Sequence, residues 1–142
     1  MRTYLIVANQ TLASPALSAE VAARLRAGLA RFHVVVPSTP IVHRLTWDEE
    51  ESRRAAEKRL ATLLAALRSA GAEASGEIGA TDPVAAVRDA LRSTAADEII
   101  LSTLPAGISR WLGQDVPSRL RDAVPVPVVV VTSVREEAAA RS

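Results

Sequence analysis

Short apolar runs separated by helical segments constrain the fold of this 142-residue chain more than any other feature. Thr3–Ala8, Phe32–Val36 and Asp97–Leu101 are nearly continuous in apolar residues, and Pro125–Thr132 closes the series. A run of this kind is typical of a strand buried on both faces, as in a parallel sheet. Ala72–Ile78 alternates only weakly and predicts a strand at the edge of the sheet.

Helical patterns fill the intervals between these runs. Ser14-Pro15 and Asp82-Pro83 each combine an N-cap residue with proline at the first helical position. Apolar residues at three- and four-residue spacing then predict three helices, with stripes at Leu17, Val21, Leu25 and Leu29, at Ala56, Leu60, Leu63, Leu64 and Leu67, and at Val84, Val87 and Leu91. A fourth, shorter helix is predicted over Ser118–Ala123.

Two terminal signals mark the long second helix. Thr46 with Glu49 predicts a capping box at its start, after a loop over Ser38–Leu45, and Gly71 predicts a left-handed cap at its end. The resulting β-α-β-α-β-α-β-α-β order predicts one α/β domain over residues 1–134, followed by a polar tail over 135–142. We expect a doubly wound, five-stranded parallel sheet with helices on both faces.

Composition excludes several functions. The formal net charge is +1 and the basic residues are spread along the chain, which argues against a nucleic-acid partner. The absence of cysteine excludes disulfides and thiolate metal sites, and no His or acidic residue stands at metal spacing from His33, which we interpret as structural. No apolar run approaches the ~18 residues of a membrane span, and no signal peptide is recognisable. A cytoplasmic protein without a membrane partner is predicted.

The pattern resembles the universal stress protein family over essentially the whole chain. Asn9-Gln10-Thr11 stands where that family usually has Asp-Gly-Ser, and His33–Val36 is similar to its "LHVV" strand. Gly79 before Asp82-Pro83 is similar to its "G-x-P" turn, Asp97–Ser102 to its "ADLIVVGS" strand, and Pro125–Val131 to its "CPVLVV" strand. The resemblance implies an adenine-nucleotide-hydrolase-like fold with strand order 3-2-1-4-5, and a dimer through the last strand.

The glycine-rich fingerprint of the family's ATP-binding members is degenerate here. Ser102 and Pro105 stand at its first two glycine positions, and Gly113 matches the third after a segment that is two residues short. Gln114 replaces the phosphate-binding hydroxyl, and Asn9 replaces the aspartate of the first loop. A Cβ blocks close approach of the backbone to a phosphate, and proline removes an N–H donor. The fold is therefore expected to carry an altered or lost nucleotide pocket.

A ligand of this fold class binds outside the carboxyl ends of the strands, where the strand order reverses. The residues delivered there are the candidate nucleotide-binding set, and ATP or AMP is the ligand that the resemblance implies: Ala8, Asn9, Gln10, Thr11, Val36, Pro37, Ser102, Thr103, Gly107, Arg110, Gly113 and Gln114. Asn9 fits a ligand contact and a strand-end turn equally well. Trp111 is interpreted as covering the core, with stacking on a purine as the alternative. Asp115 is interpreted as a helix N-cap, with a ligand-facing carboxylate as the alternative.

No nucleophile–base pair is recognisable in the sequence. The leading hypothesis is therefore a non-catalytic stress-response or regulatory module. The alternatives are an ATP- or AMP-binding protein that uses a noncanonical loop after the fourth strand, and a flavodoxin-like electron carrier, which would give a yellow preparation. An apolar last strand at a sheet edge needs cover or a partner, so we expect a homodimer through Val126, Val128 and Val130.

Overall fold

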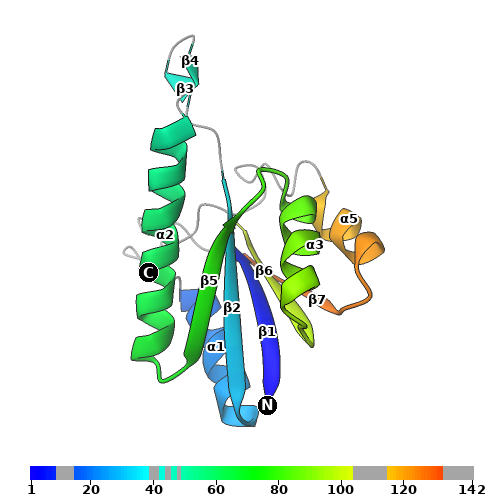
Figure 1. Ribbon diagram of the computed structural model, residues 1–142. Coiled ribbons are helices and arrows are strands. Elements are labelled where there is room, and N and C mark those ends of the chain that lie inside the picture. Colours follow the sequence, from blue (N-terminus) through cyan, green and yellow to red (C-terminus); the bar gives the residue numbers. More distant parts are fainter. Residues whose placement is uncertain (9–14, 39–41, 44–45, 48, 104–114, 133–142) are drawn as a thin grey trace.

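The computed structural model describes residues 1–8, 15–38, 42–43, 46–47, 49–103 and 115–132. Its main sheet contains β1 (Arg2–Ala8), β2 (Ala30–Pro37), β5 (Glu73–Gly79), β6 (Glu98–Thr103) and β7 (Val128–Thr132). The strands are parallel neighbours in the order β5-β2-β1-β6-β7. Numbered within this sheet alone, the order is 3-2-1-4-5, which confirms the predicted fold (Figure 1).

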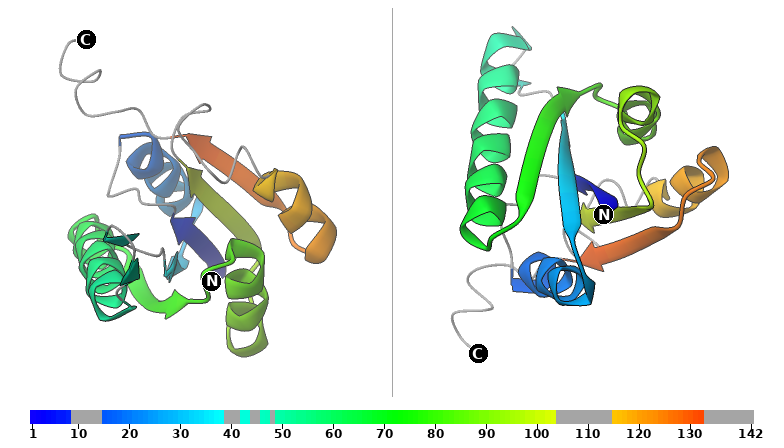
Figure 2. Two further views of the ribbon diagram at one scale, coloured as in Figure 1. Left: turned by 90° about the horizontal axis from the view of Figure 1, so that it is seen from above. Right: turned by 60° about the horizontal axis from the view of Figure 1, so that its bottom comes forward.

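The described helices cover both faces of the sheet (Figure 2). They are α1 (Pro15–Ala27), α2 (Glu49–Ser69), α3 (Pro83–Ser93) and α5 (Val116–Ala123). Alternate strand residues divide the core into two clusters. Tyr4 and Ile6 pack with residues of α1 and α2, whereas Leu5 and Val7 pack with residues of α3 and α5. Because both sides are covered, the middle of each central strand is almost continuously apolar, as the sequence runs predicted.

Two predicted helix ends are confirmed. The Asp82 carboxylate accepts a hydrogen bond from the Ala85 N–H at 3.0 Å at the start of α3. After α2, Gly71 has a φ of +89°. The Ala72 N–H donates to the Leu67 carbonyl at 3.0 Å, and the Gly71 N–H donates to Arg68 at 3.0 Å. These two bonds form a Schellman motif, whose left-handed residue favours glycine.

Three details differ from the predictions. Thr46 is not the N-cap of α2, because α2 begins at Glu49 and Thr46 pairs with His43 in a small antiparallel hairpin of β3 (Val42–His43) and β4 (Thr46–Trp47). Its first strand, β3, lies within the segment predicted as loop, Ser38–Leu45, and β4 follows directly after that segment. Leu29 does not extend the apolar stripe of α1, because the helix ends at Ala27 and Leu29 is 78% exposed.

A partly buried ion pair joins α1 to the sheet. The Arg24 Nε donates to Glu98 Oε1 on β6 at 2.9 Å, and the same guanidinium pairs with Glu20 one turn earlier on α1. It also lies over the Tyr4 ring, 5.4 Å from the centroid. These contacts position α1 against β1 and β6, the two strands at the centre of the expected site.

Candidate functional site

Five candidate residues meet at the carboxyl edge of the sheet. Ala8 ends β1 and pairs with Ser102 of β6, while the preceding pair, Val7 and Val35, places Ala8 beside Val36. Pro37 ends β2 and Thr103 ends β6, the two strands that flank β1. The topology therefore brings together Ala8, Val36, Pro37, Ser102 and Thr103. Strand β1 lies between β2 and β6, and the strand order of the sheet reverses at this point.

Burial limits what these five residues can offer a ligand. Ser102 and Thr103 are fully buried within β6, and Ala8 and Val36 are almost as inaccessible. Ser102 pairs with Ala8 on one side and Val131 on the other. The first fingerprint position is therefore a paired sheet residue, with a side chain where the family pattern has glycine.

The remaining candidates lie outside the described residues. They are Asn9, Gln10, Thr11, Gly107, Arg110, Gly113 and Gln114, and Trp111 and Pro105 lie outside as well. Their roles stay predictions.

Asp115 occupies the predicted N-cap position of α5 but does not act as the predicted side-chain cap. Its carbonyl accepts from the Arg119 N–H at 3.1 Å, whereas its carboxylate makes no capping hydrogen bond. Asp115 has φ 54° and ψ 42°, the left-handed region that non-glycine residues seldom adopt. A cap side chain needs an extended backbone to reach the N–H groups of the first turn, so this conformation explains the missing bond. The Asp115 side chain is exposed instead.

Sequence reasoning missed a Ser–His contact between the neighbouring strands β2 and β5. The His33 Nδ1 lies 2.8 Å from the Ser75 Oγ on β5. Glu77 Oε2 lies 3.3 Å from the buried His33 Nε2, in a geometry that does not form a hydrogen bond. The parallel register pairs His33 with Ser75 although 42 residues separate them. The interpretation of His33 as a sheet residue agrees with this placement, but only the strand register could have revealed its partner.

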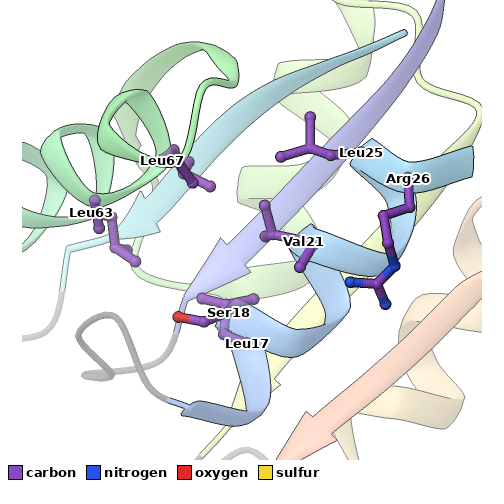
Figure 3. Close-up of a pocket in the computed structure, with 10 residues that line it drawn as sticks. Leu17, Ser18, Val21, Leu25, Arg26, Leu63 and Leu67 are labelled. Atoms are coloured by element: carbon purple, nitrogen blue, oxygen red, sulfur yellow. The ribbon is translucent and has the colours of Figure 1, made fainter. Parts of the chain in front are cut away.

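A groove of about 250 Å³ lies between α1 and α2. Figure 3 shows Leu17, Val21 and Leu25 of α1 facing Leu63 and Leu67 of α2 across it. Ser18 adds a hydroxyl to the lining, and Ala66 and Ala70 complete the α2 wall. These leucines belong to the apolar stripes predicted for α1 and α2, but the stripes did not predict the groove.

The described residues offer neither a metal site nor a membrane span. They contain no group of three or more His, Asp or Glu side chains placed to hold a metal ion. Within the same residues, no helix is both long and apolar enough to span a membrane.

The fold defines a doubly wound α/β protein whose candidate site lies at the point where the strand order reverses. Solved structures of universal stress proteins share this fold. The Archaeoglobus fulgidus protein in complex with dAMP has a TM-score of 0.62 at 17% identity, covering 92% of this chain and 98% of its own. The Arabidopsis thaliana family protein with AMP bound has a TM-score of 0.59 at 12% identity, with 96% and 95% covered. A Burkholderia pseudomallei family protein has a TM-score of 0.60 at 17% identity, with 90% and 93% covered.

This chain therefore has a universal-stress-protein-like fold. No protein-family model matches its sequence, and no curated protein matches it.

Proposed function

We propose that this protein is a non-catalytic stress-response or regulatory module whose nucleotide pocket is altered or lost. The observation that carries the proposal is Ser102, which is fully buried and paired on both sides within β6 at the first glycine position of the ATP fingerprint. A phosphate loop needs backbone N–H groups that are free to face the ligand and unobstructed by a Cβ. Pro105, the second glycine position, has no N–H donor.

The Ser75–His33 contact does not alter the non-catalytic proposal. A working triad has an acid that orients the base through a hydrogen bond, and donors for the developing oxyanion. Glu77 makes no hydrogen bond to His33, and both Ser75 and His33 sit in mid-strand positions with regular pairing. A fluorophosphonate probe is expected to leave Ser75 unlabelled, and stoichiometric labelling of that residue would contradict the proposal.

Calorimetric titration with ATP and with AMP, each with and without Mg²⁺, tests the altered pocket. We expect no saturable heat at micromolar nucleotide. A native mass spectrum of the purified protein should also show the unliganded mass. A micromolar dissociation constant for either nucleotide, or a co-purified nucleotide, would refute a lost pocket.

The second candidate function is adenine-nucleotide binding through a noncanonical loop. The dAMP and AMP complexes of structurally similar proteins favour it, as does the convergence of Ala8 and Ser102 at the carboxyl edge. Its binding set would be Asn9, Ser102, Thr103, Gly107, Arg110 and Gly113. In that case Arg110→Gln should weaken ATP binding about tenfold, whereas Arg92→Gln, which removes an exposed partner of Asp89, should leave it unchanged.

We also propose a homodimer through β7. The strand lies at one edge of the described sheet, and Val128, Val129 and Val130 are only partly buried. Val126, just before the strand, is partly buried as well. An apolar edge with unpaired backbone groups favours association with a second copy.

A further inference from the structure

The row of α2 residues that lines the groove leads, one turn earlier on the helix, to Arg59. Leu63, Ala66 and Ala70 line the groove, and Arg59 lies four residues before Leu63 on the same helix. Residues at this spacing share one helix face. Arg59 therefore lies on the same face of α2 as the groove-lining residues, one turn closer to the amino end of the helix.

The Arg59 guanidinium has an unmet hydrogen-bonding requirement. Its Nη1 is buried and has no hydrogen-bond partner, and burial lowers the pKa of the side chain. Buried donors in folded proteins are nearly always paired, and an exception calls for an explanation. An anionic group bound beside Arg59 would satisfy both the donor and the charge.

The groove below Arg59 is suited to an apolar chain. Its apolar lining includes Leu17, Val21, Leu25, Leu63 and Leu67. Arg26 also lines it, but Figure 3 shows this side chain pointing away from Leu63 and Leu67. A cavity of about 150 Å³ accommodates a benzene ring, so a groove of about 250 Å³ has room for roughly ten carbon atoms.

The two ends of the groove have different character. Ser18 lies about two turns before Leu25 on α1, and Arg59 lies toward the same end on α2. Both helices run antiparallel to the strands, so this polar end faces the carboxyl edge of the sheet, as Figure 1 shows for α2. From Arg59 to Ala66 the helix rises about 10 Å, which is comparable to the length of such a chain.

From this amphipathic arrangement we infer that the α1–α2 groove binds a medium-chain alkyl carboxylate, with its carboxylate on Arg59 and Ser18 and its alkyl chain along Leu25, Leu63 and Leu67. A guanidinium matches a carboxylate in charge and in hydrogen-bonding geometry. The ligand is thus distinct in chemistry and position from a nucleotide at the carboxyl edge. The inference does not depend on the proposed function.

Titration of the full chain with decanoate, below its aggregation concentration, tests the inference by calorimetry. Octanoate should bind about 15-fold more weakly than decanoate, because each buried methylene contributes about fourfold in affinity. Uncharged decanol should bind at least about tenfold more weakly, because it lacks the charge-assisted bond to Arg59. Equal affinity of decanol and decanoate, or no saturable binding of decanoate, would overturn the inference.

Two substitutions test the polar end and the apolar end of the groove independently. Arg59→Gln should weaken decanoate about tenfold, and Ala66→Leu should abolish binding by filling the groove. Arg53→Gln is the matched control, because Arg53 lies on α2 in an exposed pair with Glu57. Retained melting temperatures establish that the variants fold. Unchanged decanoate affinity in either test variant would refute the assignment.

Two further outcomes would also reject it. If the calorimetric titrations show that ATP does bind, competition between decanoate and ATP would place both ligands at the carboxyl edge. A dimer that dissociates in Ala66→Leu would identify the groove as a contact between two copies of the chain. We expect neither competition nor a change in molar mass.

Discussion

The Arg24–Glu98 pair allows a quantitative test of how α1 is held on the sheet. The Arg24 side chain is 13% exposed and that of Glu98 is 21% exposed, so water screens the pair only partly. Removing one partner of a fully buried pair costs about 3–5 kcal/mol, because the other charge is left uncompensated. In Glu98→Gln, Arg24 retains Glu20 as a partner. We therefore expect a loss of about 2 kcal/mol in the free energy of unfolding.

The expected loss converts to a measurable shift in melting temperature. With an unfolding entropy of about 2.1 cal/mol/K per residue, 142 residues give about 0.3 kcal/mol/K. Glu98→Gln should therefore lower Tm by about 7 °C in far-UV circular dichroism. Glu57→Gln is the control, because its pair with Arg53 is 71% and 55% exposed. An exposed pair of this kind contributes less than about 1 kcal/mol, so the control should shift Tm by no more than about 3 °C.

The pH dependence of stability provides a second test of the Arg24–Glu98 pair. Burial lowers the pKa of Arg24, but the hydrogen bonds and charges of Glu98 and Glu20 outweigh it, and the net pKa lies above its ordinary value. A base with a raised pKa stabilises the fold below its unfolded pKa, and this stabilisation is lost only as the pH rises through the folded pKa. The contribution of Arg24 to the free energy of unfolding should therefore be the same at about pH 6 and pH 9.

Equal losses of melting temperature in Glu98→Gln and in the control Glu57→Gln would refute the proposed role of the Arg24–Glu98 pair.

Three further predictions concern packing, backbone conformation and assembly. Gly79→Ala should destabilise the protein by about 1–2 kcal/mol in urea unfolding. The new Cβ would lie 2.7 Å from the Ala86 Cβ and 3.0 Å from Val35 Cγ1. Unchanged stability would mean that α3 can shift to make room for the added methyl group. Asp115→Gly should raise stability by about 1 kcal/mol by relieving the left-handed conformation, and a loss in the same assay would reveal a stabilising contact of the carboxylate. Val130→Lys should convert the proposed dimer to monomer in light scattering after size exclusion, because a charge on an edge strand opposes pairing; a persistent dimer would place the interface elsewhere.

The strands and most helices were predictable because the sheet is covered on both faces. The middle of each central strand is then almost continuously apolar, whereas each helix carries one apolar stripe, so the two patterns are easy to distinguish. Leu5 and Ile6 illustrate this, since adjacent residues are both fully buried in different clusters. The strand order came from the family resemblance, and the structure confirms it.

The differences arise where residue type does not determine backbone geometry. Thr46 and Glu49 have the spacing of a capping box, but two-residue pairing with His43 places Thr46 in a hairpin. Asp115 is a common cap residue, but its left-handed conformation directs the side chain away from the first turn. His33 and Ser75 meet only because β2 and β5 pair in one particular register. Such contacts depend on tertiary structure, which single-sequence patterns do not encode.

Substitution of Asp115 also provides a test that distinguishes an altered nucleotide pocket from a lost one. The amino end of α5 carries a partial positive charge that would favour a phosphate, and the exposed Asp115 carboxylate sits at that end and opposes it. If the pocket is only altered, Asp115→Gly should strengthen ATP binding, because it removes the repulsion and leaves the helix dipole in place. If the pocket is lost, the same substitution should change stability without creating nucleotide affinity. Decanoate binding in the α1–α2 groove should be unaffected in both cases, since Asp115 is on the other face of the sheet, among the elements that pack with α3 and α5.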